Sequence, residues 1–253
     1  MTTGQDSALA PPAPSAEPAP NSFQRIIGVL FSPDSTFASI ARRPDWVVPL
    51  VLLLVISLAA GIIMAPRVDF ASATREAMEQ NKNIPQERIE STVKMTASIA
   101  KVMTYLSPVL SLIGLLIIAG ILLLAFRLFG GEGDYKQAFS VTCYSSVPTI
   151  IKSVVTLIII VARGGMVPAQ TLATLVRSNL GFLVDMKTNP VAFALLSSID
   201  IFSIWFLALL IIGFSYVSRL SKAKSAVIII SLWIVVLLLK LIGPAMQSLR
   251  ASK

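Results

Sequence analysis

Three ionisable side chains interrupt otherwise apolar stretches of this sequence, and their chemistry most needs an explanation. Lys152, Asp200 and Lys240 each stand alone within a run of about 20 or more apolar and small residues. A charge at the centre of a bilayer costs at least about 2.5 kcal/mol on insertion scales, so it is usually paired, near the surface or functional. One acid and two bases at similar depth could form an ion pair, a proton relay or a substrate site.

The depths of the three charges can be compared through the rise of an α-helix. Counted at about 1.5 Å per residue from the predicted inner ends, Lys152 and Lys240 lie roughly 21 Å deep and Asp200 roughly 25 Å. Polar residues at helical spacing surround Lys152 and Asp200, which favours Asp200–Lys152 as the pair and leaves Asp200–Lys240 as the second choice. Lys240 could instead snorkel outward. The predicted intramembrane polar cluster contains Asp200, Lys152, Lys240, Ser197, Ser203 and Thr149.

This cluster has two interpretations. In the functional one it is a proton or substrate site within a small carrier, and in the structural one it is an ion pair that fixes helix packing. We favour the structural interpretation, because an odd number of spans with a single mid-span proline in the third, Pro148, shows little of the internal symmetry of inverted-repeat transporters. Both interpretations remain open at this point.

The residues of common catalytic sites do not combine here. The chain has no histidine and one cysteine, Cys143, so a histidine-based metal site and an intrachain disulfide are excluded. The glycine-rich segment GGEGDYKQ at 130–137 lacks the Gly-Lys-Ser/Thr ending of a phosphate-binding loop and is read as a tight turn. Without a nucleophile–base pair, paired carboxylates or metal ligands, we predict a protein that is no enzyme and needs no cofactor.

Composition indicates where these residues must lie. Hydrophobic residues make up 55% of the chain and charged ones 13%, whereas soluble domains have about 25% charged residues. The predicted fold class is therefore an all-α polytopic membrane protein, with one membrane domain over residues 22–250. Its five predicted transmembrane helices are about 46–65, 104–126, 138–162, 193–217 and 226–246.

The segments outside the spans have their own patterns. Residues 1–21 are rich in Ala and Pro and are predicted to be a disordered tail. Phe23, Ile26, Ile27 and Leu30 recur at helical spacing, and Pro33 can start a second helix, so residues 21–43 predict two short amphipathic helices. These either lie in the membrane interface or pack on the bundle. Residues 66–101 predict a charged loop that is helical from Pro85, whereas residues 163–190 form a longer link with a short helix.

The formal net charge of +8 is assigned to lipid head groups rather than to nucleic acid, because no aromatic residues interleave with the basic ones. Counting basic residues near the span ends gives an ambiguous orientation. Arg42 and Arg43 beside the first span, and three bases within 218–225, favour a cytoplasmic N-terminus and a C-terminus outside. The predicted location is a membrane, with the bacterial inner membrane as the specific expectation.

Three stretches together resemble one family. They are GVLFSPDSTFASIARRPDW (28–46), GGEGDYKQAFSVTCYSSVP (130–148) and SSIDIFSIWFLALLIIGFSYVSRLSKAKS (197–225). Their order resembles the Yip family, the Ypt/Rab-interacting membrane proteins, in its bacterial form. The resemblance implies five spans with a cytosolic N-terminus and, for eukaryotic members, trafficking through prenylated Rab-type GTPases, a role that transfers poorly to a chain with so short an N-terminal region.

The predicted function is that of a non-enzymatic Yip-domain protein, acting as a membrane-organising or partner-binding scaffold. Its expected contacts are the lipid bilayer, other membrane proteins or a second copy. The alternative is a small transporter or transporter subunit built around Asp200.

Overall fold

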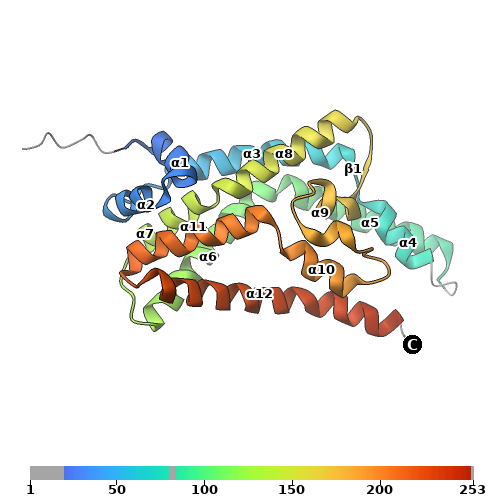
Figure 1. Ribbon diagram of the computed structural model, residues 1–253. Helices are drawn as coiled ribbons and strands as arrows, with labels where there is room; N and C mark the ends of the chain where they lie inside the picture. The colour runs from blue at the N-terminus through green and yellow to red at the C-terminus, as the bar shows by residue number, and fades with distance from the viewer. Residues whose placement is uncertain (1–19, 80–83, 252–253) are drawn as a thin grey trace, which may run out of the picture.

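The computed structural model describes residues 20–79 and 84–251, so the predicted tail lies outside the described residues up to position 19. Within those ranges the chain is almost entirely helical (Figure 1). Five helical segments are long and apolar enough to cross a membrane, which confirms the prediction of an all-α, multi-pass membrane protein. These segments are α3 (Val47–Arg67), α6 (Ser107–Leu128), α7 with α8 (Tyr135–Ser145 and Val147–Arg163), α11 (Ile201–Ser218) and α12 (Lys222–Ala251).

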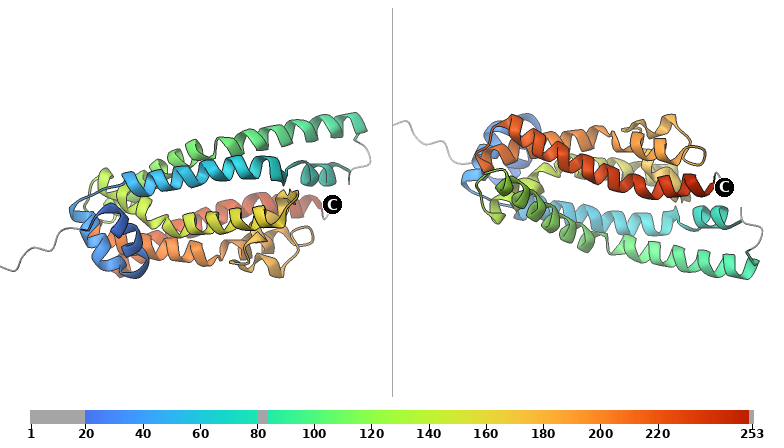
Figure 2. Two further views of the ribbon diagram at one scale, coloured as in Figure 1. Left: turned by 90° about the horizontal axis from the view of Figure 1, so that it is seen from above. Right: turned by 90° about the horizontal axis from the view of Figure 1, so that it is seen from below.

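The bundle has two ends of different character, which we call proximal and distal. The proximal end carries α1 (Ser22–Phe31), α2 (Pro33–Arg42) and the short connections 129–134 and 219–221 (Figure 1). The distal end carries residues 68–79, the connection 164–189 and the last turns of α12 (Figure 2). The described start and end of the chain therefore lie at opposite ends of the bundle.

Both predicted N-terminal helices form, and local signals explain their starts. Asn21 and Gln24 make a reciprocal capping box at the start of α1, and Pro33 occupies the first turn of α2. α2 packs against α7 and α11 and buries Phe37 completely. On α1, by contrast, three large apolar side chains of the outer face stay exposed: Phe23, Ile27 and Phe31. Of the two arrangements expected from the sequence, packing on the bundle therefore applies to α2, whereas α1 keeps an exposed apolar face.

Prolines divide two of the membrane segments. A proline cannot donate the backbone hydrogen bond that continues a helix, and α5 (Gln86–Tyr105) gives way to α6 just before Pro108. Likewise α7 ends and α8 begins around Ser146, two residues before Pro148. The hydroxyl of Ser146 donates to the Thr142 carbonyl at 2.9 Å. The buried hydroxyl of the neighbouring Ser145 has no partner among the described residues.

The fourth predicted span, 193–217, is wrong as one continuous helix. The chain forms α10 (Pro190–Ser198), leaves helical geometry at Ile199 and Asp200, and resumes as α11. Asp200 has an extended backbone and accepts hydrogen bonds from the first turn of α11, so it caps that helix. The apolar run hid this start signal, because apolar residues continue on both sides of it.

The distal connections are more elaborate than the sequence indicated. After α3, the short strand β1 (Val68–Asp69) pairs in parallel with β2 (Val167–Pro168), and α4 (Ala71–Glu79) turns back toward α5. Between β2 and α10 lie the short helices η1 (Ala169–Thr171), α9 (Leu172–Leu175) and η2 (Leu180–Leu183). The predicted short helix in this link is thus present. Together these segments cover the ends of α8 and α11 (Figure 1).

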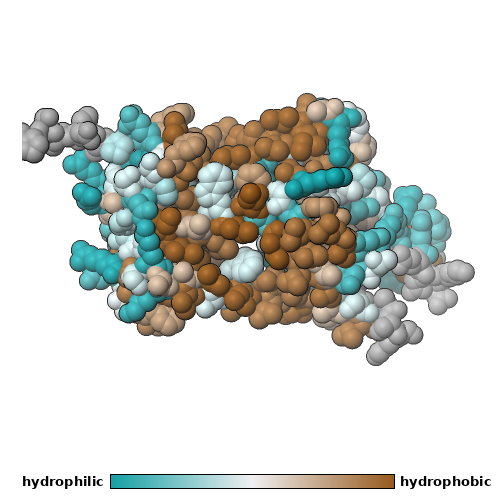
Figure 3. Space-filling view, in the orientation of Figure 1, coloured by the Kyte–Doolittle hydropathy of each residue, from teal (hydrophilic) through white to brown (hydrophobic). Residues whose placement is uncertain are grey.

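The largest buried core lies in the proximal half. There α2, α6, α7, α11 and α12 contribute to one cluster, which includes Phe37, Phe126, Tyr144 and Phe214. Phe126 and Phe214 stack with ring centroids 4.8 Å apart. The distal cluster has three buried members, Ile160, Val167 and Leu175. Hydrophobic surface covers the middle of the face in Figure 3, and hydrophilic surface lies mainly at its two ends, as a membrane-spanning bundle requires.

Candidate functional site

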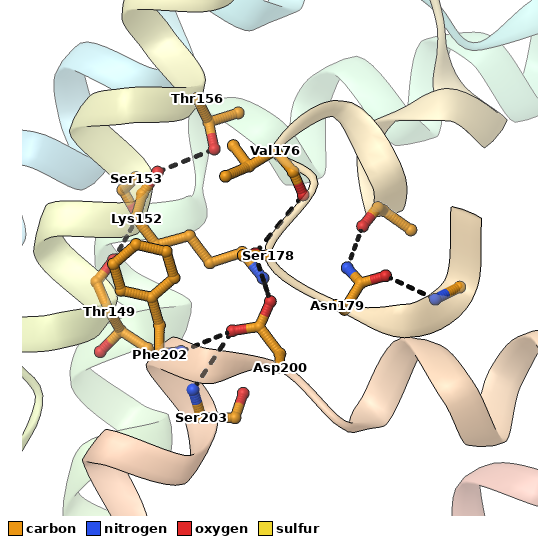
Figure 4. Close-up of polar contacts among 12 residues, drawn as sticks. Thr149, Lys152, Ser153, Thr156, Val176, Ser178, Asn179, Asp200, Phe202 and Ser203 are labelled. Carbon is orange, nitrogen blue, oxygen red and sulfur yellow. Dashed lines mark hydrogen bonds and ion pairs between the residues drawn. The ribbon is translucent and has the colours of Figure 1, made fainter. Parts of the chain in front are cut away.

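The polar cluster around Asp200 forms where the helix break meets α8. Asp200 is 1% exposed, and its Oδ2 atom lies 2.8 Å from the ammonium nitrogen of Lys152 (Figure 4). The Lys152 side chain is 32% exposed, so the acid is enclosed and the base reaches toward the surface. The structure therefore brings together Asp200 and Lys152, the pair that depth and polar spacing ranked first.

The carboxylate of Asp200 is fully occupied by donors. Oδ2 accepts from Lys152 Nζ and from Ser178 Oγ at 2.5 Å. Oδ1 accepts from the backbone N–H groups of Phe202 and Ser203 at 3.0 and 3.2 Å. Hydrogen bonds to an ionised group are stronger than neutral ones, so four of them fix this carboxylate as a charged cap of α11.

Two further residues of this cluster come from the distal link and carry no recognisable sequence signal. Ser178 supplies the hydroxyl just described, and Asn179 forms an isolated antiparallel bridge with Asp200 through the backbone. The Asn179 side chain holds the link in place by donating to the Ala173 carbonyl at 2.6 Å and accepting from Gly181 N–H at 2.9 Å. A serine and an asparagine in a polar connection are common, so only their spatial proximity to Asp200 singles them out.

The other predicted members lie at different distances from the ion pair. Lys240 forms no ion pair within the described ranges, but it lines a cavity of about 330 Å³ beside Lys152 and Asp200. Ser197 and Ser203 line the same cavity, and the buried Ser197 hydroxyl has no hydrogen-bond partner in the described part of the chain. Thr149 does not belong to this group, because it donates to the Ser146 carbonyl and lines a separate, smaller cavity facing α3 and α6.

A second polar network, which the sequence did not indicate, ties the proximal end together. Arg25 on α1 is buried, and its guanidinium donates to the Arg43 carbonyl at 2.9 Å and to Ser39 Oγ at 3.0 Å. Asp45 accepts from the hydroxyl of Tyr144 at 3.3 Å and from that of Ser22. These contacts join α1, α2 and the start of α3 to α7.

The connection between α11 and α12 is fastened to α2 by charge. Lys222 forms an ion pair with Asp34, and the Tyr216 hydroxyl donates to the same carboxylate at 3.0 Å. The hydrogen bond from Lys222 holds the pKa of Asp34 below its ordinary value. A third contact of this end is the ion pair between Arg219 and Glu132 at 3.0 Å.

Metal chemistry has no visible site in the parts of the chain that the structure describes. No group of three or more Cys, Asp or Glu side chains comes together there, and Cys143 is a buried free thiol. What the Asp200 cluster can do chemically is hold a charge, cap a helix and join α8, α11 and the distal link.

Comparison with known families assigns the chain. The model of the Yip1 domain matches residues 27–242, which is most of the sequence and runs from the second half of α1 through most of α12. The chain belongs to the Yip1 domain family. This membership confirms the resemblance read from the three stretches. The matched region contains the Asp200 cluster and most of the proximal network, whose Ser22 and Arg25 precede it. No curated protein and no solved structure matches the chain.

As a Yip1 domain protein with five apolar membrane-length helices, the molecule is an integral, multi-pass membrane protein in contact with the lipid bilayer. Large apolar side chains are exposed along the sides of these helices, for example Val55, Ile117, Leu124 and Ile204. In water such a surface would drive aggregation, whereas in a bilayer it faces lipid.

Proposed function

We propose that this Yip1 domain protein is a non-enzymatic membrane scaffold that organises the bilayer or holds a partner protein, and that its buried ion pair is structural. The observation that carries the proposal is the occupied state of Asp200. A proton or substrate site needs a free acceptor at some stage, but this carboxylate is 1% exposed and accepts four hydrogen bonds. Its hydrogen bonds instead cap α11 at the break between α10 and α11.

The α4–α5 arm supports the partner-binding part of the proposal. α5 projects along the bundle beyond the other helices at the distal end (Figure 2), and it exposes Met95 and Ile99 by 59% and 52%. The same exposed face continues through Val102 and Leu106 into the lipid-facing side of α6. A membrane-embedded helix of another protein could lie along both parts and cover apolar surface that otherwise meets water.

This surface can be tested by co-purification of the full chain from native membranes. We expect a membrane partner to be retained by the parent and lost when Met95 and Ile99 are both replaced by Asn. The matched control replaces Val55 and Ile62 on α3, where exposed apolar side chains face lipid, with Ala. Retention of every partner by the Met95/Ile99 variant would contradict the assignment of this face.

One observation favours the rival function, a small transporter or transporter subunit. The helix break between α10 and α11 and the cavity lined by Lys152, Asp200 and Lys240 are features that transporters use for substrates within the bilayer. Proteoliposome flux measurements distinguish the two functions, because a transporter's flux depends on Asp200 and a scaffold has none.

Charge-neutralising variants test the structural role of the pair. Lys152→Met alone leaves a buried carboxylate without its cation, and Asp200→Asn alone leaves the ammonium without its anion. Each should lower stability by about 2 kcal/mol. The double variant keeps an acceptor for the N–H groups of Phe202 and Ser203 and should recover most of the loss. Recovered folding with loss of an Asp200-dependent flux would support the transporter. Single variants as stable as the parent would refute the structural pair.

We further propose the bacterial inner membrane as the location, with the proximal end in the cytoplasm and the C-terminus outside. Arg42 and Arg43 beside α3, and Arg219, Lys222 and Lys224 around the α11–α12 connection, support this orientation. Compartment reporters fused at 130–136 and after the last residue should report opposite sides, and a cytoplasmic signal at the C-terminus would contradict it.

A further inference from the structure

A second cavity, of about 400 Å³, lies at the distal end between the end of α8, the distal link and α10. It shares no lining residue with the cavity around Asp200. Its polar lining consists of two guanidinium groups, two hydroxyls and one carboxylate, beside the two rings of Phe182 and Phe193: Arg163, Arg177, Thr171, Thr174 and Asp185.

Both arginines of this cavity leave their hydrogen-bond donors unused within the described residues. Neither guanidinium forms a hydrogen bond or an ion pair with the described residues, and both side chains are exposed. Arg177 lies over the ring of Phe182, 5.9 Å from its centroid, and this contact orients its guanidinium at the cavity. A planar guanidinium donates two parallel hydrogen bonds to a phosphate, so the pair is suited to one tetrahedral anion.

The depth of the cavity matches that of lipid phosphates. Arg163 is the last residue of the 29-residue membrane segment Tyr135–Arg163, so it lies where the apolar helix surface ends. Around the cavity the link exposes large apolar side chains that would enter the edge of the hydrocarbon layer: Leu180, Phe182, Leu183 and Met186. Basic pockets between membrane helices bind phosphate-bearing head groups on the cytoplasmic side of membranes, and the two arginines offer the same chemistry at this end.

We infer that this cavity binds the phosphate of a phospholipid from the leaflet at the distal end, between Arg163 and Arg177, with the acyl chains alongside the exposed apolar residues of the link. Asp185 lines the same cavity, so its wall carries two positive charges and one negative. A head group with a primary ammonium, as in phosphatidylethanolamine, complements these charges better than the neutral glycerol of phosphatidylglycerol.

Native mass spectrometry of the full chain in detergent, titrated with each lipid separately, tests this inference. The variant Arg163→Gln/Arg177→Gln should bind phosphatidylethanolamine at least about tenfold more weakly, because it loses charge-assisted hydrogen bonds to the phosphate. Arg75→Gln/Arg88→Gln is the matched control, since it removes the same charge from exposed arginines near the same end. The charge-conserving variant Arg163→Lys/Arg177→Lys should fall between the parent and the Gln variant, because an ammonium keeps the charge but loses the paired hydrogen bonds. All four side chains are exposed, so unchanged unfolding temperatures are expected and are measured alongside.

Two results would overturn the inference, and a third would remove its head-group assignment. The first is equal loss of lipid in the cavity variant and the control. The second is saturation by inorganic phosphate with no retained phospholipid, which would make the site one for a free anion. The third concerns head-group choice: Asp185→Asn should reduce the preference for phosphatidylethanolamine over phosphatidylglycerol, and an unchanged ratio would remove the role of Asp185.

Discussion

The two ends of this bundle are built in different ways. At the proximal end α2 packs closely against α11. A side chain at Gly213 of α11 would collide with Val141 and Phe37. Beneath α1, the Arg25 guanidinium donates to the Arg43 carbonyl, and the Tyr144 hydroxyl donates to Asp45. The distal end has a helix break and two cavities of about 330 and 400 Å³. Dense packing suits a fixed framework, whereas open space with free polar groups suits an exchangeable ligand.

The largest expected difference between the ends is in the cost of core truncation. Phe37→Ala should reduce the free energy of unfolding by about 3–5 kcal/mol, because it leaves a cavity in a close-packed cluster. Leu175→Ala should cost less, about 2 kcal/mol, because its cluster is small and space nearby allows the side chains to relax. Unfolding of the two variants by SDS titration in micelles measures both values. Equal costs would mean that the ends do not differ in packing.

The sequence predicted the membrane helices and the two N-terminal helices well, because both follow from local signals. Apolar runs located the membrane segments, although the fourth is interrupted at Asp200, and the residues around Asn21 and Pro33 located α1 and α2. The contact of Lys152 with Asp200 could be ranked first because helical rise places the two residues at similar depth and polar residues at helical spacing surround both. Membership of the Yip family was also legible in three stretches of the sequence.

The details of the distal end could not be predicted in the same way. The break at Asp200 was hidden because its N-cap lies inside a long apolar run, and Ser178 reaches Asp200 from 22 residues away through a link without periodic pattern. Thr149 was assigned to the cluster by spacing alone, but it lines a separate cavity that faces α3 and α6. The proximal network of Arg25, Asp45 and Tyr144 also depends on contacts between distant segments.

Two serines near the helix break, Ser178 and Ser197, provide a smaller but sharper comparison. Ser178→Ala removes a hydroxyl that donates to an ionised carboxylate and should cost about 1–2 kcal/mol. Ser197→Ala removes a buried hydroxyl without a partner among the described residues, so stability should change by less than about 0.5 kcal/mol or rise slightly. Thermal unfolding in one detergent compares them. A larger loss for Ser197→Ala would show that its hydroxyl binds a group in the cavity.

The smallest expected effect concerns pH at the proximal end. The pKa of Asp34 is lowered in the folded protein by Lys222, so the contact stabilises above the unfolded pKa of about 4 and is lost as pH falls through the lower folded value. Asp34→Asn should therefore flatten the acid side of the stability profile without changing its neutral region much, because both partners are exposed. If the stability of the variant falls at acidic pH as that of the parent does, other carboxylates cause the pH dependence.

The parallel pairing of β1 with β2 bears on the order in which the molecule is made. Val68 follows the first membrane segment and pairs with Val167, which follows the third, so residues 69–166 must all leave the ribosome after Val68 before its partner exists. Ser178 and Asp200 appear later still. Because synthesis proceeds from the N-terminus, α1, α2 and α3 are available long before the distal end can close. During insertion the protein therefore passes through a stage in which the end of α3 at Val68 has no strand partner, and this is when a chaperone or insertase would have most to protect.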